Sequence, residues 1–453
     1  METKRSQGFP NMQNSIITST KEHLNPFVFL AIFFSSMLGA QIFGISLNKI
    51  ALLPLEIYLF VRITSTHYKL HLTKLKRNLI LWYITLMLSS ALALTRQEQL
   101  YGYEEKLIFN LIQYIAIYFP ILLMIDVIKN PFNQFKKAII IVSQINSIWA
   151  IVQFILWYIF QIDFNEFFFS TCLKGLLGTE WTAWNFEAGA LAMRATGLNR
   201  DPAFLAILMV LGFTFTKSNL WKSIFVFSCI CAMSRVGMVS IAASLLFSLF
   251  RREGSNIALF KTKSLIKILA IISLVIIVFL YLYNTIEIVQ FQTDYTLTRF
   301  SILKMDSNTG DVSGTTRHIM YLPLSILTFC DFPWLEKLFG VGPRIGGTAL
   351  AFNDSVKSVI ELSAGMQKNA WAIECDFAEI LLGSGLFGFI LYYINLYILF
   401  KKNKADKGKQ TSIVGLFAFG FMYCVGFNTL MNLYLIFMVS DNILKDKPNI
   451  NDE

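Results

Sequence analysis

The chain has 453 residues, of which 55% are hydrophobic and 15% charged, and its mean hydropathy is +0.56. This composition excludes an ordinary soluble domain, and continuous apolar runs without period-two alternation favour helices over a β-barrel. The net charge of +10 does not indicate nucleic-acid binding, because the basic residues are spread over several short loops beside apolar runs. We therefore predict an all-α polytopic membrane protein.

Measured against the roughly 20 apolar residues that a spanning helix needs, the chain contains about 12 predicted transmembrane spans. In chain order these are Pro26–Ser46, Ile50–Ile63, Leu79–Thr95, Leu107–Ile125, Ala138–Gln161, Ala203–Thr216, Trp221–Met233, Val236–Phe250, Ile266–Tyr283, Ile373–Phe400, Ser412–Cys424 and Thr429–Val439. The first span is too long for a signal peptide and lacks a clear small-residue cleavage site, so we expect it to stay in the mature chain.

Basic residues predict the orientation of these spans, because short loops rich in Lys and Arg stay in the cytoplasm. Such loops follow the second, fourth, eighth and tenth spans, and acidic residues lie mainly in the loops of the other side. We expect the following order: a cytoplasmic tail (1–25), a bundle (26–284) with a smaller outer loop (162–202), a large, partly helical outer loop (285–372), the last three spans (373–440) and a cytoplasmic tail (441–453). The large loop lies between the ninth and tenth spans and is predicted to be periplasmic, with both termini cytoplasmic.

Cysteine and histidine patterns indicate no metal site and no cofactor. The six cysteines form no CxxC motif, and four histidines do not complete a zinc or iron constellation. Cys172, Cys330 and Cys375 lie on or near the predicted outer side, where a disulfide and free thiols are both open alternatives.

Four arginines on the predicted outer side are the strongest candidates for binding an anion. They are Arg194 before Gly197 and Asp201-Pro202, Arg235 in Ser234-Arg235-Val236-Gly237, Arg317 after the helix start Ser313-Gly314-Thr315-Thr316, and Arg344 at the end of Gly340-Val341-Gly342-Pro343-Arg344. For each one, the alternative is a side chain that snorkels to the membrane surface or forms a surface ion pair. Because the planar guanidinium fits phosphate oxygens, four of them on one side favour phosphate binding.

Acidic residues at the start of the tenth span supply the second half of the predicted site. Glu374 is suited to taking a proton from a sugar hydroxyl, with Asp376 and His318 as secondary candidates. The alternative is that these acids complement the helix dipole or pair with arginine, and for Glu379 we prefer this structural interpretation. A structural hydrogen bond is the alternative for His318.

Together these segments resemble the O-antigen polymerase and O-antigen ligase superfamily of bacterial membrane glycosyltransferases. The resemblance rests on Arg194-x-x-Gly197 with Asp201-Pro202, the Ser234–Gly237 turn, the Arg317 helix, the Phe339–Gly342 turn and the Glu374-to-Gly385-x-x-Gly388 span, and it covers Met193 to Phe400. It implies a metal-independent enzyme acting on undecaprenyl-diphosphate-linked glycans at the outer face of the inner membrane. Arg194, Arg235, Arg317 and Arg344 would bind the diphosphate, with Glu374 and Arg317 as the catalytic residues.

Departures from the family pattern help to choose within it. Ligases of this pattern carry a His-Asn pair where this chain has Glu374-Cys375, which favours a polymerase, and Ala203 stands where the family often has Asn. We expect a polymerase of lipid-linked repeat units for O-antigen or a related surface polysaccharide. Its expected partners are membrane lipids, a chain-length regulator and a flippase of the same pathway, and no nucleic acid.

A ligase and a polysaccharide transporter or flippase are the alternative functions. Transporters usually place ionisable residues and broken helices near the bilayer midplane, often in related repeats. This chain instead concentrates its charges at one predicted face and has no evident half-to-half repeat. A non-catalytic envelope scaffold would leave the four arginines unexplained.

Overall fold

The computed structural model describes residues 23–37, 40–42, 45–66, 68, 72–95, 104–173, 186–187, 192–251, 314–357 and 373–441, with single positions between 280 and 294. Helices dominate these residues, and the strands among them form two short antiparallel pairs. The pairs are β1 (Gln41–Ile42) with β2 (Ile45–Ser46), and β3 (Phe186–Glu187) with β4 (Ala192–Met193). The chain is thus an all-α membrane protein, as its composition predicted.

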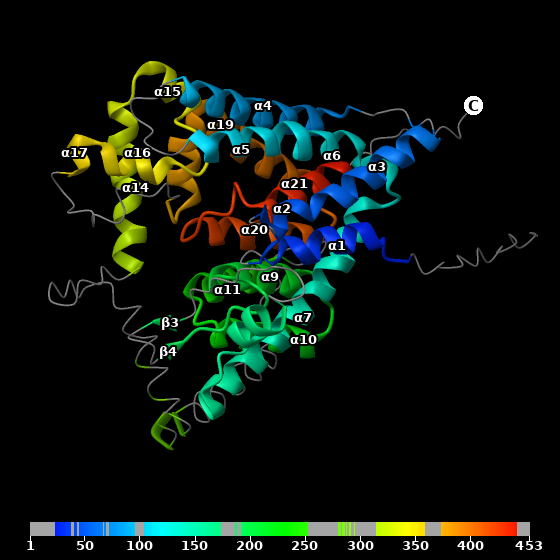
Figure 1. Cartoon of the computed structure of the whole chain (residues 1–453), viewed down its shortest axis with the longest axis vertical. Helices are drawn as coiled ribbons and strands as arrows, with labels where there is room; N and C mark the ends of the chain where they lie inside the picture. Colours follow the sequence, from blue (N-terminus) through cyan, green and yellow to red (C-terminus); the bar gives the residue numbers. More distant parts are fainter. Residues whose placement is uncertain are drawn as a thin grey trace, which may run out of the picture.

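The N-terminal half surrounds the central helices (Figure 1). Its elements are α1 (Pro26–Ser35), α2 (Leu47–Ile50), α3 (Leu52–Thr66), α4 (Lys74–Leu94), α5 (Glu104–Gln113), the π-helical turn Tyr114–Tyr118, α6 (Phe119–Met124), the 3-10 turn Ile125–Val127, α7 (Pro131–Phe160) and the π-helical segment Glu166–Leu173. In Figure 1, α4 and α5 lie at the top, α1 and α3 at the right and α7 at the bottom. Pro120 explains the π turn, because it lacks the N–H that would bond to the preceding turn and its ring pushes that turn away.

The C-terminal half supplies the centre and the segments that carry most of the predicted site. Its helices are α9 (Pro202–Phe215), α10 (Asn219–Cys231), α11 (Arg235–Phe250), α14 (Gly314–Asp331), α15 (Trp334–Phe339), α16 (Gly346–Phe352), α17 (Asp354–Lys357), α19 (Asp376–Lys402), α20 (Lys407–Gly420) and α21 (Thr429–Asp441). The helices α14 to α17 belong to the predicted outer loop and gather at the N-terminal end of α19 (Figure 1).

Among the described residues, four helical segments are long and apolar enough to cross a membrane: Lys74–Leu94, Glu104–Val127, Pro131–Phe160 and Asp376–Lys402. The other predicted spans coincide with shorter helices, except Ile266–Tyr283, which lies mostly outside the described residues. The first predicted span, Pro26–Ser46, does not form one helix. α1 ends at Ser35, where the Ser36 hydroxyl donates a 2.6 Å hydrogen bond to the carbonyl of Phe33, and the β1–β2 pair follows.

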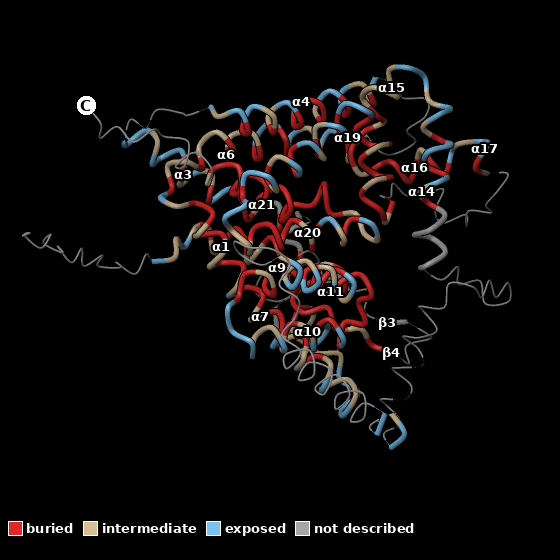
Figure 2. Tube along the Cα trace, turned by 180° about the vertical axis from the view of Figure 1, so that it is seen from behind, coloured by how far each residue is buried: buried red, intermediate tan, exposed pale blue. Residues whose placement is uncertain are grey.

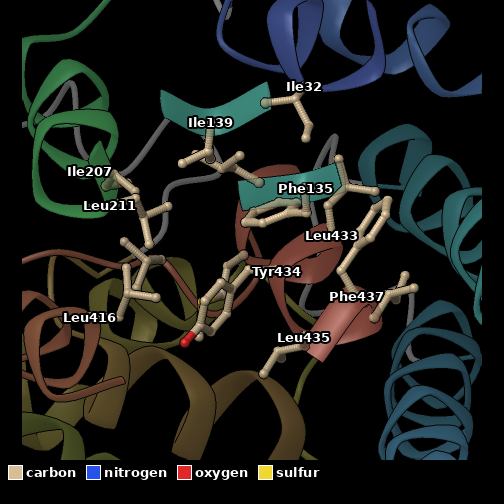
Figure 3. Packing of buried hydrophobic residues seen from close by; sticks show 14 of the residues in the cluster. Ile32, Phe135, Ile139, Ile207, Leu211, Leu416, Leu433, Tyr434, Leu435 and Phe437 are labelled. Carbon is tan, nitrogen blue, oxygen red and sulfur yellow. The ribbon is translucent and has the colours of Figure 1, made fainter. Parts of the chain in front are cut away.

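Helix α21 is the centre of the core. Every residue from Thr429 to Ser440 is buried, as expected for a helix that is apolar on all sides. Leu433 and Phe437 pack among residues of α7 such as Phe135 and Ile139 (Figure 3). Figure 2 shows buried residues concentrated along α21, α20 and α9.

Two ion pairs are buried at helix ends. Lys76, in the first turn of α4, pairs with Asp126 and also donates to the carbonyl of Leu123 at 3.4 Å. Lys409, in the first turn of α20, pairs with Asp441 at the end of α21. Thr73 caps α4 by accepting from the Lys76 amide, so the helix begins at Lys74 and not at the predicted Leu79.

The Lys76–Asp126 pair generates a stability prediction. Lys76→Met keeps the length of the side chain but leaves the Asp126 carboxylate buried without its ammonium partner, so we expect a loss of about 3–5 kcal/mol of unfolding free energy. Adding Asp126→Leu should recover most of this loss, measured by unfolding in detergent. The exposed Lys74→Met serves as the control, and an equal effect of Lys74→Met and Lys76→Met would refute the interpretation.

Candidate functional site

The loops that carry the predicted site residues meet at one end of the short helices. The amide of Ala195 donates to the carbonyl of Cys231 at 3.0 Å, and the Tyr423 hydroxyl donates to Asp201 Oδ2 at 2.9 Å. These contacts join the loop before α9, the turn between α10 and α11, and the loop between α20 and α21. At the opposite end, Arg251 after α11 contacts the carbonyl of Lys404 before α20.

Arg194 and Arg235 lie on two of these joined segments. The Nε of Arg194 donates to the carbonyl of Ala232 at 3.3 Å, and Arg235, a buried residue, is the first residue of α11. Ser234 caps α11 by accepting from the amide of Gly237 at 3.2 Å. The structure therefore brings the loop of Arg194 and the helix start of Arg235 together.

The Gly340–Arg344 turn docks on a kink in α19 by backbone contact. The amides of Val341 and Gly342 donate to the carbonyls of Leu382 and Gly383 at 2.9 and 3.0 Å. Gly385 interrupts α19 with φ +64°, and a Cβ on Gly340 would lie 2.5 Å from the carbonyl carbon of Gly383. Only glycine allows so close an approach of two backbones.

Arg344 ends this turn with φ +67°, in the left-handed region that non-glycine residues seldom adopt. The Asn110 side chain on α5 donates to the carbonyl of Pro343 at 2.9 Å and so fixes the turn from the other side. The positive charge of Arg344 acts on the hydroxyl of Tyr114 and on the carboxylate of Glu379. The surrounding contacts thus hold Arg344 in a strained backbone conformation. Strain of this kind is typical of functional sites.

Glu379 is fully buried and has a structural role in this geometry. Its Oε1 accepts from the amide of Gly346 at 3.1 Å, and its Oε2 accepts from the amide of Ile373 at 2.7 Å. The charges of Lys106 and Arg344 act on the same carboxylate. Glu379 thus stabilises the start of α19 by accepting from two backbone amides, a structural role.

The segment Tyr423–Gly426 lies between the two basic turns. Besides the bond from Tyr423 to Asp201, the amides of Val425 and Gly426 each donate to Asp376 Oδ1 at 2.7 Å. Glu374 precedes Asp376 by two residues, so these bonds bring the start of α19 to the Tyr423–Gly426 segment. Asp376 is buried and holds the segment in place.

Arg317 and His318 lie in the first turn of α14, which begins at Gly314, as the predicted helix start requires. The side chains of residues 314–320 are outside the described part, so neither side chain is placed relative to the other candidates. Cys330 and Cys375 are free thiols, and the side chain of Cys172 also falls outside the described part. Within the described ranges, no group of three or more His, Cys, Asp or Glu residues is arranged to hold a metal ion.

Tyr423, Asn110 and Lys106 were missed by the sequence analysis. Each acts through a partner far away in sequence, such as Asp201 for Tyr423 and Pro343 for Asn110. The only local signal was a polar residue within an apolar run, which is common in helices of this kind. No protein-family model matches the chain, and a search of curated proteins finds no match.

The docking of the turn on α19 predicts that Gly340→Ala destabilises the protein. The new Cβ would meet the backbone of Gly383 and Gly385 at 2.5–2.6 Å, and the positive φ of +79° adds strain. We expect a cost of about 1–3 kcal/mol or more, measured as a lower thermal unfolding midpoint in detergent. Gly408→Ala is the control, because its Cβ would meet no atom closer than 3.4 Å, and equal midpoints for both variants would contradict the docking.

The contacts of Glu379 predict that Glu379→Gln is destabilising although the shape is unchanged. A glutamine has one acceptor oxygen, so one of the two amides that bond Glu379 would face an NH₂ group. A buried donor left without its acceptor costs about 1–3 kcal/mol. The measurement is again thermal unfolding in detergent, compared with the exposed Glu105→Gln. A Glu379→Gln protein as stable as the wild type would show that these amides do not depend on the carboxylate.

Proposed function

We propose that this chain is a metal-independent membrane glycosyltransferase that polymerises lipid-linked oligosaccharide repeat units. The observation that carries the proposal is the position of the Tyr423–Gly426 segment. It bonds Asp201, next to the Arg194 and Arg235 segments, and it bonds Asp376, two residues after Glu374. The turn of Arg344 docks on the same helix, α19, at Leu382 and Gly383. These contacts between segments support a shared site for the arginines and Glu374.

Phosphate is the group that best suits this arrangement. Arginine forms charge-assisted, bidentate hydrogen bonds with phosphate oxygens, and a diphosphate offers several such oxygens to more than one arginine. The reaction is substitution at the anomeric carbon of the growing chain. Its bond to the undecaprenyl diphosphate breaks, and an acceptor hydroxyl of a new lipid-linked unit forms the glycosidic bond.

Glu374 takes the proton of that hydroxyl as the new bond forms. Arg194, Arg235, Arg317 and Arg344 bind the diphosphate and stabilise the negative charge that develops on the leaving group. The acceptor unit remains on its own lipid carrier, so each transfer lengthens the growing chain by one repeat unit. The product class is O-antigen or a related surface polysaccharide, made at the outer face of the bacterial inner membrane with both termini in the cytoplasm.

Two observations favour this function over the alternatives. The ion pairs Lys76–Asp126 and Lys409–Asp441 lie at helix ends, whereas a transporter or flippase usually places such groups near the middle of the membrane. O-antigen ligases of the resembled pattern carry a His-Asn pair where this chain has Glu374 and Cys375, which favours a polymerase. A ligase is the second candidate.

The proposal predicts that purified protein converts undecaprenyl-diphosphate-linked repeat units into long chains. Glu374→Gln should lower kcat by about 10²–10⁴-fold, because it removes the base. Arg194→Ala, Arg235→Ala and Arg317→Ala should each lower kcat/KM by about 10–100-fold, corresponding to about 1.5–3 kcal/mol per charged hydrogen bond. Product lengths are read by gel electrophoresis and the rates by release of undecaprenyl diphosphate.

The matched control is Arg77→Ala, which should keep full activity. Arg77 is exposed and lies in the first turn of α4. No polymer from the wild-type protein, with transfer to a different acceptor such as lipid A core, would favour a ligase. Single units that accumulate at the inner face of cells lacking the protein would indicate a flippase. Unchanged rates in the Glu374 and arginine variants would overturn the assignment of the site.

A further inference from the structure

The turn between Arg194 and Asp201 is held by hydrogen bonds to side-chain amides of α7. The backbone amides of Thr196 and Gly197 both donate to Gln153 Oε1, at 3.0 and 3.2 Å. The next amide, of Leu198, donates to Asn146 Oδ1 at 3.0 Å. Three successive backbone N–H groups are therefore directed into the protein, toward two side chains that are fully buried.

A third buried amide, Asn165, completes this support. Its Nδ2 donates to Thr196 Oγ1 at 2.8 Å and to the carbonyl of Gly197 at 2.9 Å, while its Oδ1 accepts from the indole of Trp149 at 2.7 Å. Gly197 has φ +63°, and a Cβ there would lie 3.0 Å from Asn146 Oδ1. The turn and the three amides are complementary in hydrogen bonding and in shape.

Hydrogen bonding explains why this support is specific. A buried carboxamide without a partner is costly, and this cost is greatest in the middle of a membrane protein. Asn146 and Gln153 lie on α7, a helix of 30 residues that is otherwise largely apolar. The register of the turn is set by the Thr196 side chain, which bonds Asn165, and by the positive φ at Gly197.

The same bonds determine how the turn can bind an anion. Because the amides of Thr196, Gly197 and Leu198 donate inward, they are not directed at a ligand on the outer side. The positive groups that the turn presents are the side chains at its two ends, Arg194 and Arg200. A hydrogen bond from its Nε to the carbonyl of Ala232 holds the Arg194 side chain next to the start of α11.

We infer that Gln153 and Asn146 are positioning residues for binding of the diphosphate, because they hold the turn that carries Arg194 and Arg200. This inference rests on the proposed function and adds to it a set of residues that do not touch the substrate. Gln153 is the better of the two to test, because its oxygen receives two backbone amides.

Gln153→Leu removes the acceptor at nearly constant volume. Binding of undecaprenyl diphosphate to the purified protein should weaken about tenfold, and kcat/KM for the lipid-linked donor should fall on the order of 10–100-fold, mainly through KM. Gln153→Glu keeps the acceptor oxygens, and the Thr196 hydroxyl can turn to donate to them, so this variant should restore binding. Gln144→Leu, a partly exposed residue of the same helix, should bind like the wild type.

The outcomes separate this inference from the proposed function. Wild-type protein that does not bind undecaprenyl diphosphate would overturn both. Wild-type binding with equal binding by Gln153→Leu, or an equal loss in Gln144→Leu, would overturn the positioning role alone. If Gln153→Leu does not fold, Thr196→Val replaces it, because it removes the hydroxyl that bonds Asn165. We then expect about threefold weaker binding, and unchanged binding would overturn the inference.

Discussion

Most of the candidate site depends on one constraint. The backbone of the Gly340–Arg344 turn directly contacts the backbone at the kink of α19. This contact requires glycine at both Gly340 and Gly385, since a Cβ on either one would overlap the other segment. Once the turn is docked, the position of Arg344 is set. The start of α19 is fixed at the same time, because Glu379 bonds both Gly346 and Ile373.

The two basic turns of the site are held by different physical means. The later turn depends on close packing without side chains, whereas the turn after Arg194 depends on hydrogen bonds with the buried carboxamides of Asn146, Gln153 and Asn165. The segment around Tyr423 connects them through Asp201 on one side and Asp376 on the other. Residues as far apart in sequence as Asp201 and Tyr423 therefore meet in one region, and a change in any of the three supports alters the spacing of the arginines.

The sequence was sufficient to predict most helices, because apolar runs and local caps determine them. Helices α9 and α11 begin within one residue of the predicted Ala203 and Val236, and the Phe339–Gly342 segment was predicted as a turn. Their contact with each other was not predicted, since neither segment carries a signal of its partner. The early end of α1, the support from Gln153 and the role of Tyr423 were missed for the same reason. Hydropathy describes how apolar a segment is, but it does not specify which buried polar atoms pair.

The lengths of the central helices have a consequence for the membrane itself. Helices α9, α10, α11, α20 and α21 have 13 to 16 residues, whereas α7 has 30 and α19 has 27. At about 1.5 Å per residue the short helices rise only about 20–24 Å, less than the roughly 30 Å thickness of the hydrocarbon layer. Lipid beside this group would have to become thinner to match it. Under the proposed function, this thinning would bring the headgroup of the lipid-linked substrate closer to Arg194 and Arg235, without the protein having to lift the lipid out of the bilayer.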